Sequence, residues 1–120
     1  MKIIGSINEN IIKLLELKID VNTPILLGKS NIEHMKNKHP ADYDKYKDEI
    51  ENILSNPDYI GSNPTDGSIE YVKEYFVDNE YVKVAVRVSS QNKYYARTLY
   101  ILNSKRVINY IAKGTLKPIK

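Results

Sequence analysis

Residues 82–90 have the sequence VKVAVRVSS, the most regular stretch of the chain. The apolar positions are Val82, Val84, Val86 and Val88. The positions between them are Lys83, Ala85, Arg87 and Ser89. Side chains of a β-strand point alternately to opposite faces, so this stretch predicts a strand with one face in the core and one polar face. The polar face would carry Lys83 and Arg87.

The segments on either side extend this strand into an antiparallel meander. Ser68 to Val77 alternates in the same way, and residues 78–80 resemble a tight hairpin turn. On the C-terminal side, a turn at residues 90–92 leads into a third long strand, Lys93 to Leu102. Before all three, Tyr59-Ile60 can begin a fourth strand. We therefore predict an antiparallel sheet of three or four strands.

Helical patterns lie mostly before the meander. Apolar residues fall at helical spacing over Asn8 to Leu17, and a second helix should begin at Ser30 or Asn31 and end near His39, because proline disfavours a helix interior. A third should run from Ala41 to about Ser55, and a short last one from Lys105 to Ala112. Two brief β-prone segments, Lys2 to Ile4 and Ile25 to Leu27, lie between them. The order predicts an α+β fold, with N-terminal helices packed on one face of the sheet and a short C-terminal helix.

Size and composition fit one domain over residues 1–120. The chain has 120 residues, no cysteine and no apolar stretch long enough to cross a bilayer. The start MKIIGSINEN lacks the apolar core of a secretory signal. We therefore expect a soluble cytoplasmic protein with no disulfide, no thiolate metal site and no membrane partner.

The formal charge of +3 is distributed very unevenly. Residues 1–80 contain nine Lys or Arg against fifteen Asp or Glu, whereas residues 81–120 contain nine Lys or Arg and no acid. The same basic segment carries five tyrosines: Tyr81, Tyr94, Tyr95, Tyr100 and Tyr110. Cations beside aromatic rings suit a phosphate backbone with stacked bases. The alternative, that strands favour tyrosine and the cations are solvated, is equally compatible with the composition.

Both histidines lie in the segment HMKNKHP, residues 34–40. A metal site is one interpretation, but the spacing of five residues between His34 and His39 places them far apart around a helix, and no third ligand is evident. A second interpretation is a solvated basic face. A third is proton transfer without metal or other cofactor, because histidine titrates near neutral pH.

The third interpretation matches the needs of RNA cleavage by the 2′-hydroxyl group. That reaction requires a base for the hydroxyl, an acid for the departing 5′-oxygen, and cations for the phosphorane. Phosphate contacts could come from Lys83, Arg87, Lys93 and Arg97. Bases could stack on tyrosines of the open sheet face, for which the candidates are Tyr71, Tyr75, Tyr94 and Tyr95.

Four segments together resemble the phage-associated branch of the barnase, EndoU, colicin and RelE-like nuclease superfamily. They are GKSNIEHMKNKHP, ILSNPDYIG, VKVAVRVSS and YYARTLYIL, within a similarity that spans about Gly5 to Ile119. The resemblance implies a small α+β fold and metal-independent ribonuclease chemistry, often of a toxin or phage-borne effector. His34 and His39 match its histidine motif, and Thr98 matches a hydroxyl residue of a late strand.

One strand leaves the site geometry open. If Leu99 and Ile101 join the valine core, strict alternation puts Thr98 on the open face and Arg97 on the core face, where an unpaired guanidinium is costly. A bulge near Ser90 to Tyr94 would reverse this assignment.

These observations lead to one functional hypothesis and one rival. The hypothesis is a ribonuclease that leaves a 2′,3′-cyclic phosphate, with His34 and His39 as proton-transfer groups and Arg87 and Thr98 at the phosphate. Its expected partners are RNA and an acidic immunity or antitoxin protein. The rival is a non-catalytic module that binds nucleic acid or a protein through the same basic face.

Overall fold

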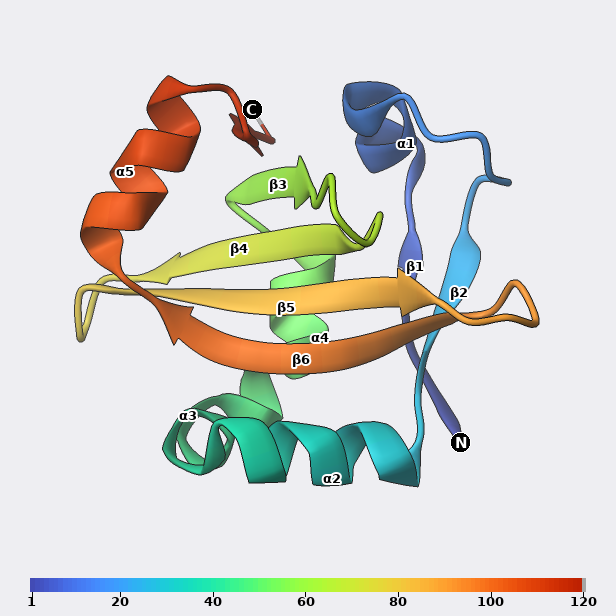
Figure 1. Cartoon of the computed structure of the whole chain (residues 1–120), viewed down its shortest axis with the longest axis horizontal. Helices are drawn as coiled ribbons and strands as arrows, with labels where there is room; N and C mark the ends of the chain where they lie inside the picture. Colours follow the sequence, from blue (N-terminus) through green and yellow to red (C-terminus); the bar gives the residue numbers. More distant parts are fainter. Residues whose placement is uncertain (120) are drawn as a thin grey trace.

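A computed structural model describes residues 1–119, which form an α+β fold as predicted (Figure 1). Within these residues, seven strands make one mixed sheet in the order β1-β2-β6-β5-β4-β3-β7. The strands are β1 (Lys2–Ile7), β2 (Thr23–Leu27), β3 (Tyr59–Ser62), β4 (Ile69–Tyr75), β5 (Glu80–Val88), β6 (Tyr94–Leu102) and β7 (Leu116–Pro118). The sheet therefore has more strands than the three or four predicted, and it is mixed rather than purely antiparallel.

The difference comes from short strands that pair over long sequence distances. The antiparallel meander β3-β4-β5-β6 is present. The antiparallel pair β1-β2, whose strands are separated in the sequence by residues 8–22, joins the edge of β6 through two parallel pairs, Ile25 with Tyr94 and Leu26 with Tyr95. At the other edge, β7 pairs with β3. Such short segments have too few residues for a clear alternating pattern, so their pairing is not visible in the sequence.

Five α-helices and one 3-10 helix complete the described residues. They are α1 (Glu9–Leu15), α2 (Lys29–Lys38), α3 (Pro40–Tyr46), the 3-10 helix η1 (Lys47–Glu49), α4 (Ile50–Ser55) and α5 (Ser104–Ala112). Pro40 begins α3, in the first-turn position where proline is tolerated. The predicted helix over residues 41–55 is interrupted by η1, and Asn103 caps α5 with its side chain.

The helices are divided among several surfaces of the sheet. In Figure 1, α4 lies behind β5 and β6, where Val82, Val84 and Val86 are fully buried in the main core. Helices α2 and α3 run along the edge of β6, and α5 lies at one end of the opposite face. The prediction that the N-terminal helices pack together on one face is thus wrong, because α4 covers that face while α2 and α3 lie along the edge of β6. What remains is the face of β5 and β6 that is turned toward the reader in Figure 1, which we call the open face because α4 lies behind these strands.

A bulge in β6 answers the question about Arg97 and Thr98. Ala85 pairs with Thr98, whereas Val86 pairs with Ala96, so Arg97 is an extra residue in the ladder. Ala96 and Leu99 are both fully buried on the core face. The two residues between them therefore lie together on the open face. The alternative of a bulge near Ser90 to Tyr94 is not what the structure shows, because the extra residue is Arg97.

Residues 1–119 contain no helix with the length and apolar character needed to span a membrane.

Candidate active site

The open face of the sheet contains a cleft that we name the His34 cleft. Its volume is about 300 Å³. Five side chains predicted for the site line it: His34, Lys83, Arg87, Arg97 and Thr98. They come from α2, β5 and β6, and six further residues complete the wall: Asn63, Asp66, Ser68, Glu70, Ala85 and Tyr100. Segments that are far apart in the sequence thus meet in one cleft.

His34 enters the cleft from the middle of α2 and is partly buried. Burial lowers the pKa of its imidazole, and the positive charges of Arg97, Lys38 and His39 lower it further. The imidazole is therefore predominantly neutral at pH 7, since its ordinary pKa is 6.5. A neutral imidazole can accept a proton from a hydroxyl group.

The two arginines differ in their surroundings. Arg87 Nε lies 4.0 Å from Oδ2 of Asp66, whose pKa is lowered mainly by a hydrogen bond that its carboxylate accepts from the backbone N–H of Ser68. Arg97 forms no ion pair within the described part of the chain and is exposed. Arg97 therefore offers its full charge to an anion, whereas Arg87 is already partly balanced by Asp66.

Lys83 lies in the floor of the cleft with a carboxylate partner. Its Nζ is 2.7 Å from Oε2 of Glu70, and the two side chains are only 12% and 13% exposed. Burial by itself lowers the pKa of Lys83, but the Glu70 carboxylate and the Tyr100 hydroxyl outweigh it and raise the pKa. The Lys83 ammonium also lies 4.7 Å from the centre of the Tyr100 ring. Lys83 is therefore a fixed, permanently charged group.

His39 lies at the junction of α2 and α3, outside the lining of the His34 cleft. Its ring stacks on Tyr100, with the ring centres 4.7 Å apart and the planes 25° from parallel. Tyr100 itself lines the cleft. His39 is thus separated from the cleft by one aromatic ring.

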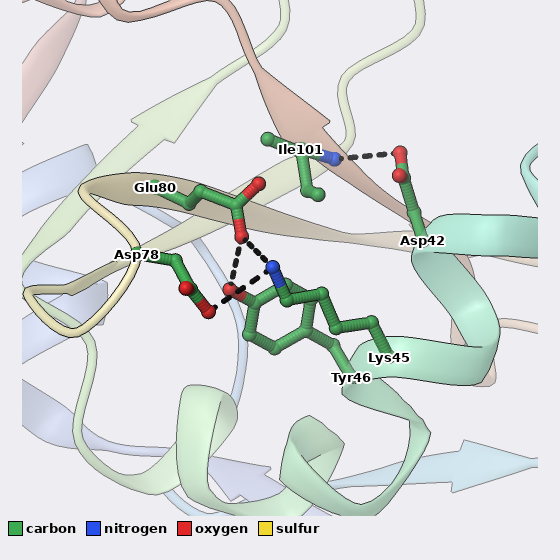
Figure 2. Close-up of polar contacts among 6 residues, drawn as sticks. All are labelled: Asp42, Lys45, Tyr46, Asp78, Glu80 and Ile101. Carbon is green, nitrogen blue, oxygen red and sulfur yellow. Dashed lines mark hydrogen bonds and ion pairs between the residues drawn. The ribbon is translucent and has the colours of Figure 1, made fainter.

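The position of α3, and with it His39, is fixed by a group of polar contacts that Figure 2 shows. In the first turn of α3, Asp42 Oδ2 accepts a hydrogen bond of 3.0 Å from the backbone N–H of Ile101. This N–H lies on the edge of β6 that β2 leaves uncovered. In the last turn of α3, Lys45 and Tyr46 both donate to Glu80 Oε1 at 2.6 Å. Lys45 also pairs with Asp78 at 3.1 Å. We refer to Lys45, Tyr46, Asp78 and Glu80 as the α3 clamp.

Three residues predicted to bind substrate lie elsewhere. Tyr71 is fully buried, because it pairs with Val84 on the core face of the sheet, so its expected place on the open face is wrong. Lys93 is exposed in the turn before β6, and Tyr95 lies beside Met1 at the far end of the sheet. Neither contributes to the His34 cleft. The alternative stacking residues Tyr75 and Tyr94 pack against the main core.

The cleft also contains residues that were not predicted. Asp66 and Glu70 bring carboxylates from the acidic part of the chain, and Tyr100 supplies an aromatic wall. Glu70 pairs with Ala85 in the β4-β5 ladder, beside Lys83. The strict alternation of residues 68–77 already indicated that Glu70 and Tyr71 point to opposite faces of the strand. Without the register of β4 against β5, however, the sequence did not show which of the two residues faces the core.

Residues 1–119 hold no group of three or more His, Cys, Asp or Glu side chains arranged to bind a metal ion.

Comparison with known proteins gives one match. A family model described as phage-Barnase-EndoU-ColicinE5/D-RelE like nuclease3 matches residues 2–109, which is nearly the whole chain. No curated protein and no solved structure matches the sequence significantly.

Proposed function

The chain belongs to the phage-Barnase-EndoU-ColicinE5/D-RelE like nuclease3 family, and on this premise we propose that it is a ribonuclease acting by 2′-hydroxyl attack. The reaction would leave a 2′,3′-cyclic phosphate and a free 5′-hydroxyl group and would need no metal ion. The observation that carries this proposal is the meeting of a neutral imidazole, two guanidinium groups and a hydroxyl in the His34 cleft.

In this mechanism His34 is the general base. Its neutral ring takes the proton of the 2′-hydroxyl, and the oxygen attacks the adjacent phosphorus. Arg87 and Arg97 bind the non-bridging oxygens and stabilise the charge that develops on them. The hydroxyl of Thr98 donates a further hydrogen bond to the phosphate.

Lys83 places an ammonium group that is paired with Glu70 below the phosphate. Glu70 keeps this ammonium group charged and in place. Because the Glu70 carboxylate already pairs with Lys83, we do not assign it the proton-transfer role. The cleft is open to solvent, so water can protonate the departing 5′-oxygen.

We assign His39 to hold the Tyr100 ring rather than to transfer a proton. This assignment is supported by the stacking distance of 4.7 Å and by the absence of His39 from the cleft lining. A His39→Phe variant keeps a stacking ring but has no titratable group, whereas His39→Ala loses both. We expect His39→Phe to retain activity within about threefold and His39→Ala to lose about tenfold. Loss of activity in both variants alike would make His39 the proton donor.

The test of the proposed function is cleavage of labelled RNA in the presence of EDTA. We expect the wild-type protein to cleave, and His34→Ala to be slower by at least about a hundredfold, the usual contribution of a general base. The thermal transition should be nearly unchanged, because His34 is only partly buried. Loss of wild-type cleavage in EDTA would point to a metal ion, and salt-sensitive RNA binding without any product would favour a binding module.

A toxin or phage-borne effector that acts in the cytoplasm is the biological role we propose for this activity. The acid-free segment of residues 81–120 carries nine Lys or Arg. An acidic immunity or antitoxin protein that covers this face would match its charge and block the cleft. Expression in bacteria should be toxic for the wild type and tolerated for His34→Ala.

A further inference from the structure

A second and larger cavity adjoins the His34 cleft on the same face of the sheet. Its volume is about 590 Å³, within the range of small-ligand pockets. It lies between α5, the strands β4 to β6 and the loop at Asn63. We call it the α5 pocket. Four residues line both cavities and so form the wall between them: Asn63, Glu70, Lys83 and Tyr100.

The far side of the α5 pocket offers hydrogen-bond donors. Arg106, in the first turn of α5, points its exposed side chain toward the pocket and forms no ion pair within residues 1–119. Asn103 uses Oδ1 to cap α5, and Asn63 uses Oδ1 to accept from Thr65 N–H. Their amide NH₂ groups have no hydrogen-bond partner in the described structure and are free to donate. The one carboxylate of the pocket, Glu70, is already paired with Lys83.

The remaining walls are flat or apolar. The rings of Tyr100 and Tyr110 line the pocket, together with Val72 and Leu116 of the second small core. Aromatic rings and apolar side chains suit a planar heterocycle better than a phosphate group. A cavity with aromatic walls and donors at its rim therefore has the chemistry of a nucleobase site.

We propose that the α5 pocket binds the base of a nucleotide whose phosphate lies in the His34 cleft. This inference rests on the proposed ribonuclease function. The Lys83–Tyr100 wall is the boundary between base and phosphate, and Arg106 recognises acceptor atoms on the edge of the base. The free groups of the rim are donors, which suit a base with carbonyl oxygen acceptors better than adenine, whose N1 and N7 acceptors flank an amino group that is itself a donor.

Binding of small ligands tests the proposal without depending on cleavage. The four nucleoside 3′-monophosphates are titrated against the protein beside inorganic phosphate, which has no base. At least one carbonyl-bearing nucleotide should bind roughly tenfold more tightly than inorganic phosphate. Arg106→Gln should remove most of this advantage and leave the affinity for inorganic phosphate unchanged.

Lys105→Gln is the matched control, because it removes one positive charge from the adjacent position of α5 outside the pocket. It should leave the affinity for both ligands unchanged. The proposal is overturned if no nucleotide binds more tightly than phosphate, or if Arg106→Gln and Lys105→Gln behave alike. Nucleotide binding that needs Arg106 in a protein that cleaves no RNA would instead sink the ribonuclease proposal and leave the base site standing.

Discussion

Arg97 is the residue whose position depends most on a local irregularity. The bulge in β6 turns it to the open face, where its charge contributes to the lowered pKa of His34. Strict alternation would have buried the guanidinium beside the valines, at a high cost in free energy. The bulge therefore allows an exposed guanidinium group on a strand whose core face carries the buried Ala96 and Leu99.

This placement predicts how the pH profile responds to a change at Arg97. As the pH falls, protonation removes the base form of His34, so kcat/KM should decline through a pKa below the ordinary value of 6.5. Arg97→Gln removes a neighbouring positive charge, so this acidic limb should move to higher pH, while the maximal rate falls because a phosphate contact is lost. Lys93→Gln, an equal charge change outside the cleft, should leave the limb in place. An acidic limb that stays fixed in Arg97→Gln would contradict the assignment of His34 as base.

Tyr71 shows a different kind of local irregularity. Its side chain is fully buried, and its hydroxyl has no hydrogen-bond partner among residues 1–119. Burial raises the pKa of this phenol, which therefore stays protonated. A buried polar group without a partner costs about 1 to 3 kcal/mol.

We therefore expect Tyr71→Phe to raise the free energy of unfolding by about 1 kcal/mol in urea denaturation. Tyr46→Phe is the comparison, since the Tyr46 hydroxyl donates to Glu80 at 2.6 Å and its removal should destabilise the protein. Destabilisation of similar size in both variants would mean that the Tyr71 hydroxyl does have a partner in solution.

At the scale of elements, α3 is held more by polar contacts than by its own length. It has only seven residues, too few for a stable isolated helix. Tyr43 and Tyr46 bury one side of α3, and the α3 clamp ties its last turn to the β4-β5 hairpin. These contacts keep the α2-α3 junction, and hence His39, against Tyr100.

The α3 clamp should make stability depend on acid. Hydrogen bonds from Lys45 and Tyr46 lower the pKa of Glu80 below its ordinary value of 4.5. The stabilisation is therefore fully present above that value and is lost as the pH falls through the lower pKa of the folded state. Glu80→Gln should reduce the free energy of unfolding at pH 7 by about 1 kcal/mol and flatten its decline in acid.

Glu33→Gln serves as the control for this prediction. Glu33 is exposed on α2 and forms no ion pair within the described residues, so its removal should change neither the stability nor its dependence on pH. An acid transition that is equally steep in Glu80→Gln and the wild type would show that the clamp does not stabilise the fold.

The sequence predicted long elements well and short ones poorly. The alternating valines span enough residues to define a strand, and the helix predicted over residues 41–55 covers α3 and α4, although η1 interrupts it. The pairing of β2 with β6, and of β7 with β3, depends on contacts between distant segments that no local pattern contains. For the same reason η1 and the bulge at Arg97 were not foreseen.

At the scale of the whole molecule, the candidate site is built from both the acidic residues 1–80 and the acid-free residues 81–120. The acid-free segment contributes Lys83, Arg87 and Arg97, and the acidic part contributes His34. The acidic part also brings Asp66 and Glu70 into the cleft. The net positive charge of the cleft is therefore much smaller than the nine Lys or Arg of residues 81–120 suggest. Three of the four cations predicted from sequence line the cleft and Lys93 does not, whereas the carboxylate partners of Lys83 and Arg87 required the register of β4 against β5.

The measurement that tests the central claim most directly uses a DNA oligonucleotide with a single ribonucleotide, incubated with the protein in EDTA. We predict cleavage only at the ribonucleotide, a product that ends in a 2′,3′-cyclic phosphate, and a loss of at least about a hundredfold in His34→Gln. Cleavage of the all-DNA control, a product without the cyclic phosphate, or full activity of His34→Gln would contradict the account.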